Sequence, residues 1–151
     1  MKNRPMYSLT EPTKADATDV ARRLAQFPLF SAADQRALRT IAEAGRTVTV
    51  PAGWSLILHH TTADKAYVVL DGQVEIRRGD AEPIVLGAGD VIGEVAILEG
   101  RLRTATCVAA SRLEVLHLTA DAVRRLYDEV PAFHEALDAT VAARFGTPAD
   151  R

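Results

Sequence analysis

Cysteine is nearly absent from this chain of 151 residues, which contains only Cys107. A disulfide within the chain and a thiolate metal cluster are both excluded, because each needs more than one thiol. Cys107 alternates with Thr106 and Val108 in an expected strand, which is typical of a structural thiol. The low cysteine content fits a reducing compartment, and we expect a cytoplasmic protein.

A large excess of charge of one sign is also lacking, since 18 Lys and Arg residues stand against 20 Asp and Glu residues, for a net charge of -2. Binding to nucleic acid by counterion release requires clustered Lys and Arg, so we expect no nucleic-acid partner for this chain alone. Long apolar runs are missing as well, and none approaches the ~18 residues that cross a bilayer. We therefore expect no membrane segment.

What remains is the composition of one ordinary globular domain, 48% hydrophobic and 25% charged. Residues 1–18 are polar, contain two prolines and have no apolar signal core. We expect them to form a flexible lead-in to a domain over residues 19–146, with a short tail at residues 147–151.

Helical periodicity is confined mainly to the two ends of the domain. At the N-terminal end a short helix is expected over residues 19–25, and a second one after Ser31, which is a good N-cap. The second helix places Leu38 and Ile41 on one face and ends at Gly45.

At the C-terminal end, Thr119 is expected to cap a helix over residues 120–129, and Pro131 to open a last helix that ends at Gly146. Apolar residues recur at steps of four along this last helix: Phe133, Leu137, Val141 and Phe145. The stripe favours packing on the core, while a lid over a ligand and a dimer seam remain open alternatives.

Between these helices the pattern has period two or short apolar runs, separated by turn residues. Strands are expected over residues 47–50, 55–58, 66–70, 73–77, 83–86, 104–109 and 113–118. Asp71-Gly72 between two of these runs predicts a tight hairpin, since both central residues of a type I′ turn need positive φ. Many short strands at spacings of about ten residues indicate a sandwich or barrel, and so a mainly β fold with flanking helices.

The segment from Ile92 to Thr106 interrupts the strand rhythm. Gly93 ends a strand, and residues 94–99 are long enough for one or two helical turns. The start of a short helix inserted among strands exposes unpaired N–H groups, which attract an anion. Arg103 follows at the start of the next strand, where its guanidinium can turn back onto that anion with paired hydrogen bonds.

Glu94 lies in the first turn of this short helix, where a carboxylate is favourable. Its carboxylate can also accept a hydrogen bond from a sugar hydroxyl. Taken singly, the glycines, Glu94 and Arg103 have ordinary structural explanations. Their spacing within a strand-rich pattern favours a site for a ligand that combines an anion, a sugar hydroxyl and an apolar base.

Gly93-Glu94-Val95-Ala96 followed by Arg103-Thr104-Ala105-Thr106 resembles the phosphate-binding cassette of cyclic-nucleotide-binding domains. This family includes regulatory subunits of cyclic-nucleotide-dependent kinases, cytoplasmic domains of cyclic-nucleotide-gated channels and bacterial catabolite activators. The spacing of residues 67–72 and 87–94 also resembles the family's β-roll, and the likeness covers residues 24–145. It implies a double-stranded β-helix, a jelly-roll-like β-roll, with N-terminal helices and two C-terminal helices.

The resemblance implies a cyclic nucleotide as ligand and gives roles to particular residues. Arg103 would pair with the phosphate oxygens, helped by backbone N–H groups near Val95 and Ala96, and Glu94 would hold the ribose 2′-hydroxyl. Gly93 would allow close approach, Thr104 and Ala105 would lie beside phosphate and base, and Ile76 and Leu86 would wall the pocket. The Thr104 hydroxyl can bond a syn guanine, yet we favour cyclic AMP as the commoner ligand and leave cyclic GMP open.

The chain departs from the family's pattern in two places. The family usually has Gly followed by Asp in the loop after the second strand, where this chain has His60 and Thr61. It often has Pro just before the arginine, where this chain has Leu102. We expect the loop over residues 58–64 to take another path, and neither change to touch the ligand groups.

His59 and His60 suggest a metal site of the kind that cupins build in a β-barrel. The next histidine of that pattern would have to stand at Thr61, and adjacent residues of a strand point to opposite faces. We therefore expect no metal site and no cofactor.

No nucleophile–base pair, phosphate-binding loop or carboxylate dyad is evident, so we expect a regulatory module rather than an enzyme. Its C-terminal helices would move on binding, with an unknown effector protein as partner or a homodimer through those helices. A DNA-binding regulator of the catabolite-activator type would need a helix-turn-helix beyond the last helix, and the chain stops at Arg151 without room for one. We therefore expect either a truncated regulator of that type or a chain with no DNA-binding output of its own. A ligand-free interaction scaffold of the same fold is a further alternative.

Overall fold

The computed structural model describes residues 14–145 of the chain. Its helices are α1 (Lys14–Ala25), the 3-10 helix η1 (Pro28–Phe30), α2 (Gln35–Ala44), α3 (Glu94–Glu99), α4 (Ala120–Glu129) and α5 (Pro131–Phe145). Its strands are β1 (Arg46–Val50), β2 (Ser55–Ile57), β3 (Lys65–Asp71), β4 (Val74–Arg77), β5 (Ile84–Leu86), β6 (Val91–Ile92), β7 (Thr106–Ala109) and β8 (Leu113–Thr119). Apart from β6 and η1, for which the sequence predicts no range, this order of elements is the one that the periodicity of the sequence predicts.

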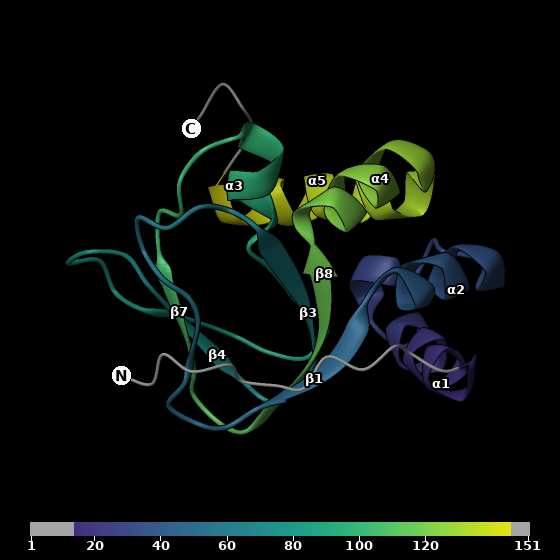
Figure 1. The fold of residues 1–151 in the computed structure, drawn as a ribbon, viewed down its shortest axis with the longest axis horizontal. Helices are drawn as coiled ribbons and strands as arrows, with labels where there is room; N and C mark the ends of the chain where they lie inside the picture. The colour runs from purple at the N-terminus through teal and green to yellow at the C-terminus, as the bar shows by residue number, and fades with distance from the viewer. Residues whose placement is uncertain (1–13, 146–151) are drawn as a thin grey trace.

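The strands form two antiparallel four-stranded sheets, with the orders β1-β8-β3-β6 and β2-β7-β4-β5. In Figure 1 the first sheet runs through the middle of the molecule, between the second sheet on the left and the helices on the right and above. The predicted fold class is confirmed: a mainly β, jelly-roll-like β-roll with flanking helices.

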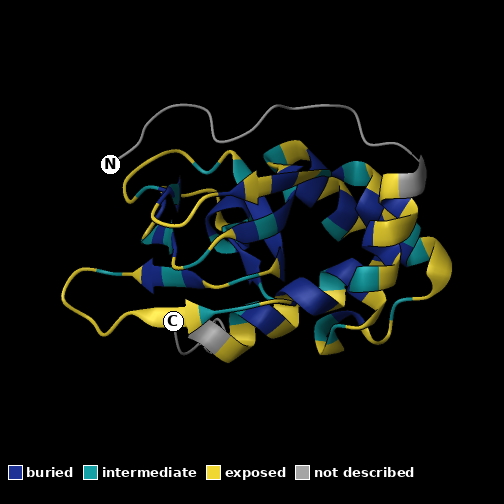
Figure 2. Ribbon diagram, turned by 90° about the horizontal axis from the view of Figure 1, so that it is seen from below, coloured by how far each residue is buried: buried dark blue, intermediate teal, exposed yellow. Residues whose placement is uncertain are grey.

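Strand β3 of the sheet β1-β8-β3-β6 is buried on both faces, which explains its apolar run. Ala66, Val68 and Leu70 pack with the helices in one core cluster, whereas Tyr67 and Val69 pack against the second sheet in another. Successive side chains of a strand point to opposite faces, so a strand between helices and a sheet is apolar throughout. Figure 2 shows the buried residues gathered where strands and helices meet, and exposed residues in the protruding loops.

The Asp71-Gly72 hairpin predicted between β3 and β4 is wrong. β3 pairs with β6 and β8, whereas β4 lies in the other sheet and pairs with β5 and β7. Gly72 has a φ of 97°, but Asp71 does not have a positive φ and still belongs to β3, opposite Glu114. The chain crosses between the sheets at Gly72, where an added Cβ would collide with the backbone oxygen of Arg112.

The N-cap of α2 differs from the prediction. The Asp34 carboxylate accepts a hydrogen bond from the Ala37 N–H at 2.8 Å, so Asp34 and not Ser31 caps this helix. Ser31 instead closes the preceding η1 turn through its own N–H. Thr119 caps α4 as predicted, because its hydroxyl accepts from the Ala122 N–H at 3.1 Å.

The first helix begins before its predicted boundary, whereas the last helix begins where it was predicted. α1 begins at Lys14, so part of the expected lead-in is helical, and Ala17 is 2% exposed in the core. α5 opens at Pro131 as predicted, while Gly146 lies outside the described residues. Phe133 and Leu137 are fully buried, which bears out the packing interpretation for these two residues. Within residues 14–145, no helix has both the length and the hydropathy that a membrane crossing requires.

Candidate functional site

A pocket lies where α3 meets strands of both sheets, and it encloses about 440 Å³ of space free of atoms, part of it open to solvent. It is lined by Ile57, Ile76, Arg78, Ile92, Gly93, Glu94, Val95, Ala96, Arg103, Thr104, Ala105 and Cys107. Every residue predicted to contact a ligand belongs to this set except Leu86. Leu86 lies on β5, pairs with Val74 of β4 and packs against the core between the sheets.

Gly93 is the residue directly before α3, and its backbone is left-handed, with a φ of 90°. An added Cβ would lie 3.0 Å from Nη1 of Arg103 and 2.9 Å from Cδ1 of Ile57. Only glycine therefore leaves room for the guanidinium and adopts this conformation without strain. Arg103 itself approaches Gly93 closely, and the close approach of a ligand at Gly93 stays a prediction.

Arg103 is buried, with 4% of its surface exposed. Its Nη1 donates to the Gly93 carbonyl oxygen at 2.5 Å, and its Nη2 donates to the Lys65 carbonyl oxygen. Burial lowers the pKa of the guanidinium from its ordinary value, and the negative charge of Asp64 acts against that shift. An anion in the pocket would offset the desolvation of this charge, because a buried cation is stabilised by an opposite charge.

Glu94 lies in the first turn of α3, is 0% exposed and lines the same pocket as Arg103. Together they give the pocket a carboxylate that accepts from a hydroxyl and a guanidinium that donates paired hydrogen bonds to an oxyanion. Three isoleucines from different strands, Ile57, Ile76 and Ile92, supply apolar wall. This arrangement suits a ligand with an anionic group, a hydroxyl and an apolar ring.

The loop between β2 and β3 contacts the backbone of Arg103 through main-chain groups, and the His60 and Thr61 side chains take no part in these two bonds. The His60 N–H donates to the Arg103 carbonyl oxygen at 3.0 Å, and the Arg103 N–H donates to the Thr61 carbonyl oxygen at 2.9 Å. His60 has a φ of 69°, which suits the glycine that is usual in the family. The loop therefore holds Arg103 through main-chain groups, which any residue type provides.

Sequence reasoning missed four of the lining residues: Ile57, Arg78, Ile92 and Cys107. The period-two rule could have found Arg78, because this residue lies two positions beyond Ile76, which had been placed in the wall. Thr104 and Ala105 do line the pocket, but they precede β7 instead of belonging to it, since that strand begins at Thr106.

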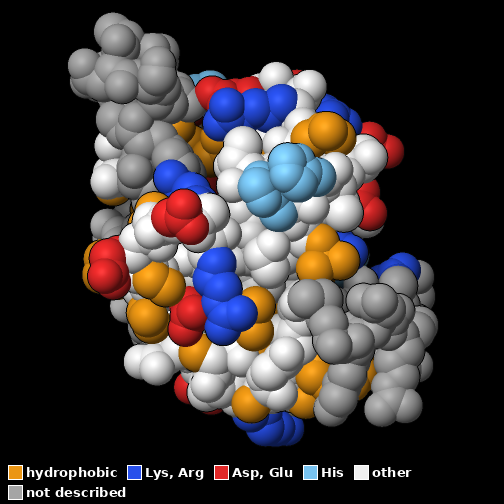
Figure 3. Space-filling model, turned by 90° about the vertical axis from the view of Figure 1, so that its left-hand side faces the viewer, with side chains coloured by type: hydrophobic (Ala, Val, Ile, Leu, Met, Phe, Trp, Pro, Cys, Tyr) orange, Lys and Arg blue, Asp and Glu red, His pale blue; other side chains and the backbone are white. Residues whose placement is uncertain are grey.

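His59 and His60 lie in the loop after β2 and not in a strand. Their rings stack, with centroids 3.7 Å apart and planes 17° from parallel, so the argument that they point to opposite faces is wrong. Figure 3 shows histidine side chains gathered on the face of the molecule that lies on the left in Figure 1. Among the described residues, no group of three or more His, Cys, Asp or Glu side chains is placed to hold a metal ion.

Comparison with known sequences agrees with this geometry. The family described as "Cyclic nucleotide-binding domain" matches residues 47–130. A cyclic nucleotide-gated potassium channel of Rhizobium etli is 33% identical over 125 residues, which are 83% of this chain and 35% of the channel. The cAMP-dependent protein kinase regulatory subunit of Schizosaccharomyces pombe is 31% identical over 93 residues, which are 61% of this chain and 23% of that protein.

Solved structures share the fold. The regulatory domain of Toxoplasma gondii protein kinase A, solved with cAMP, has a TM-score of 0.74 at 20% identity, over 85% of this chain and 51% of that one. A cAMP-binding acyltransferase from Mycobacterium smegmatis has a TM-score of 0.67 at 27% identity, over 88% and 42% of the two chains. This chain spans about a third of the Rhizobium channel that it matches, 35% of its length. With a family match that runs from β1 to the end of α4 and includes the pocket, this chain belongs to the family of cyclic nucleotide-binding domains.

Proposed function

We propose that this chain is the cyclic-nucleotide-sensing part of a regulatory protein, and that it binds its ligand without catalysing a reaction on it. The observation that carries the proposal is a buried arginine, Arg103, and a buried carboxylate, Glu94, in one pocket with apolar walls. Arg103 donates to the phosphate oxygens, with backbone N–H groups at Val95 and Ala96 beside it, and Glu94 accepts from the ribose 2′-hydroxyl.

The apolar wall holds the base of the nucleotide. Ile76, Thr104 and Ala105 all line the pocket. In this proposal Ile76 walls the base, and Thr104 and Ala105 lie beside the phosphate and the base. Cyclic AMP is the first ligand to test, because similar proteins include kinase regulatory subunits named for their dependence on cAMP. Cyclic GMP is the second, since the Thr104 hydroxyl can pair with a guanine amino group.

Binding is proposed to move the terminal helices. α3 begins at the pocket and contacts α4, and α4 packs along α5. A ligand shifts such an arrangement only through a difference in affinity between two packings, so the contacts of α3 with α4 must differ between them. The output then belongs to an effector protein that meets α4 and α5, or to a second copy of the chain docked on the same helices.

Calorimetric titration of the Arg103→Ala variant tests the proposal. A hydrogen bond to a charged group contributes about 1.5–3 kcal/mol, so the variant should bind cyclic AMP or cyclic GMP more weakly by about tenfold to over a hundredfold. Arg101→Ala is the matched control, because Arg101 is exposed, pairs with Glu99 and does not line the pocket.

Melting curves of both variants show whether either substitution unfolds the domain. Arg103→Lys retains the charge but not the paired geometry, so it should also bind weakly while it preserves the fold. A wild-type chain that binds neither nucleotide would contradict the proposal and favour the ligand-free scaffold. Unchanged affinity in a folded Arg103→Ala variant would contradict the role of this arginine.

A further inference from the structure

The turn after β2 contains two stacked histidines, His59 and His60, which the proposed binding of a nucleotide does not use. The turn runs from Leu58 to Thr61 and is closed by two hydrogen bonds to the Leu58 carbonyl oxygen, from the Thr61 N–H at 3.3 Å and the Thr61 hydroxyl at 2.6 Å. The imidazole rings lie face to face, with centroids 3.7 Å apart. Both histidines are exposed, so their rings exchange protons with solvent.

His60 adopts a backbone conformation that favours glycine. Its φ of 69° is the only positive one among the described residues other than glycine. An L-residue is strained in this region by contact of its Cβ with the following carbonyl oxygen. Within residues 14–145 the two imidazoles make no ion pair and no hydrogen bond, so the stack is the contact through which these side chains stabilise the turn.

The turn holds the segment that carries Arg103 at three points. The His60 N–H donates to the Arg103 carbonyl oxygen at 3.0 Å, and the Arg103 N–H donates to the Thr61 carbonyl oxygen at 2.9 Å. The His59 N–H donates to Oγ1 of Thr106 at 3.0 Å. Any residue type provides these N–H and carbonyl groups at positions 59–61, but their placement depends on the positive φ at position 60. A change in the turn therefore moves the backbone from which Arg103 reaches the pocket.

We propose that the stacked pair positions Arg103 and makes the affinity for the nucleotide depend on pH; this inference rests on the proposed function. Histidine is the side chain that changes charge between about pH 5 and pH 8. One proton leaves the pair with a single charge, so repulsion begins with the second proton. Two positive charges on rings 3.7 Å apart then separate the rings. His60 loses the contact that offsets its strained φ, and the turn releases the backbone of Arg103.

Binding of the nucleotide and of the second proton therefore oppose each other. The nucleotide requires Arg103 in its held position and so disfavours the second proton, and the proton weakens the nucleotide by the same factor. The repulsion of two unit charges about 4 Å apart in water corresponds to about fivefold in an equilibrium constant. The affinity for the nucleotide should fall by up to about fivefold through the stack as the pH falls from 7.5 to about 5.

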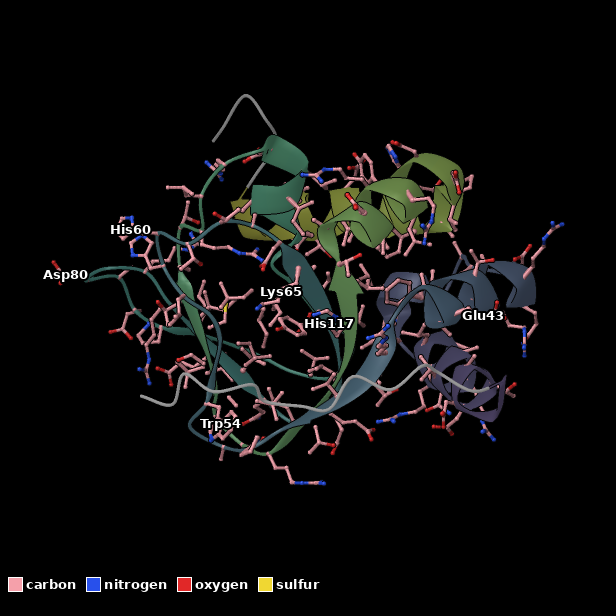
Figure 4. The ribbon with its side chains drawn as sticks, viewed as in Figure 1. Glu43, Trp54, His60, Lys65, Asp80 and His117 are labelled. Carbon is pink, nitrogen blue, oxygen red and sulfur yellow. The ribbon has the colours of Figure 1, made fainter. Side chains whose placement is uncertain are left out.

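Other charged side chains lie on the same loop and on the two neighbouring segments, residues 77–82 and 101–103. They are Asp64, Arg77, Arg78, Asp80, Glu82, Arg101 and Arg103. Figure 4 shows Asp80 on the same side of the molecule as His60. The variants that test the pair leave all of these groups in place, so their contribution to a pH dependence is common to the proteins compared.

Titration of the full chain with cyclic AMP and with cyclic GMP, at pH 7.5 and at about pH 5, tests this inference. His59→Ala and His60→Gly each leave one histidine, so the loss of affinity between the two pH values should be smaller than in the wild type by up to about fivefold. His60→Gly also relieves the strain at φ 69°. His60→Val is strained there, so it should bind more weakly than His60→Gly at pH 7.5.

His134→Gln is the matched control, because it removes a histidine of α5 that lies outside this loop. It should retain the wild-type difference in affinity between the two pH values. His117 is present in every variant, so any pH dependence that it causes cancels in the comparison. Melting temperatures measured without ligand at both pH values show that each protein is folded where its affinity is measured.

The outcomes separate this inference from the proposed function. The same loss of affinity at about pH 5 in the wild type, His59→Ala and His60→Gly would overturn the role of the stack and leave the sensor proposal intact. Tighter binding by the wild type at the lower pH, absent from both variants, would also overturn it, because the charged rings would then attract the phosphate. A wild-type chain that binds neither nucleotide at pH 7.5 would overturn the proposed function, and the role of the stack with it.

Discussion

Glu94 has none of its surface exposed, although it carries a carboxylate. A buried carboxylate is unfavourable unless hydrogen bonds or opposite charges stabilise it. Arg103 lines the same pocket and supplies an opposite charge, and the proposed ribose hydroxyl would supply a hydrogen bond. The roles proposed for the two buried charged residues of the pocket are therefore separate, and they can be tested separately.

Glu94→Gln should weaken the binding of the ribonucleotide by about five- to tenfold, because a neutral amide oxygen is a weaker acceptor for the 2′-hydroxyl than a carboxylate. The same substitution should have no such effect on a 2′-deoxy cyclic nucleotide, which lacks the hydroxyl. Titrating both proteins with both ligands gives a double-mutant cycle. If Glu94→Gln weakened both ligands equally, Glu94 would stabilise the pocket without contacting the ribose.

At the same scale, sequence motifs reveal only part of the site. Gly93, Glu94 and Arg103 could be predicted, because they lie in or near one short helix and their spacing matches the phosphate-binding cassette of the family. Arg78 lies outside this pattern and just after β4, and only its place two residues beyond Ile76 indicates that it lines the pocket. The role of the loop at His60 was missed for a related reason, since its contact with Arg103 joins backbone groups distant in sequence.

At the scale of elements, the positions of the strands were easier to predict than their pairing. β8 was expected over residues 113–118 and is found at Leu113–Thr119, because its alternation is a local property of the chain. β6, with two residues, is too short to give a periodic signal. The Asp71-Gly72 sequence predicted a hairpin because local turn preferences say nothing about the sheet that the next strand joins. That choice is made by packing between the two sheets, which is not local.

Substituting Gly72 tests this crossing between sheets. Gly72→Ala adds a Cβ that would collide with the Arg112 backbone oxygen, at a φ of 97° that alanine rarely adopts. Backbone strain and overpacking together should lower the free energy of unfolding by about 2–5 kcal/mol. The control is Gly53→Ala, whose φ of 88° carries similar strain but whose Cβ would meet nothing within 4 Å. Urea unfolding should show a clearly larger loss of stability for Gly72→Ala than for Gly53→Ala. Equal losses would mean that the crossing at Gly72 is not crowded.

At the scale of the whole molecule, the helices from the two ends of the chain share one core. Phe30 of η1 and Phe133 of α5 belong to the same buried cluster, on the helical side of the first sheet. α4 and α5 are joined by the Tyr127 hydroxyl, which donates to Oδ1 of Asp138 at 2.6 Å, and this bond raises the pKa of Tyr127 to about 12. The rings of Tyr127 and His134 also stack, with centroids 3.9 Å apart. These contacts would make α4 and α5 respond as one unit in the proposed movement, and the contact of α5 with η1 would pass it to η1 as well.

We expect His117 to make the stability of the folded domain depend on pH. It lies on β8, opposite Arg46 of β1 and Tyr67 of β3, and so in the middle of the sheet that separates the two cores. Burial, and then the positive charges of Lys65 and Arg46, lower the pKa of His117 below its ordinary value, while Asp64 acts in the opposite direction. Figure 4 shows Lys65 and His117 near each other at the centre of the view.

Because the folded state lowers the pKa of His117, the unfolded chain binds a proton here more readily than the folded one does. The contribution of neutral His117 to stability is therefore fully present above about pH 6.5 and is lost as the pH falls from there toward the folded pKa. A single group of this kind changes the free energy of unfolding by at most about 1.4 kcal/mol per pH unit. Urea unfolding at pH 7.5 and at pH 5.5 should show a larger loss of stability in the wild type than in His117→Gln. The same loss in both proteins would assign the pH dependence to other groups, since glutamine does not titrate.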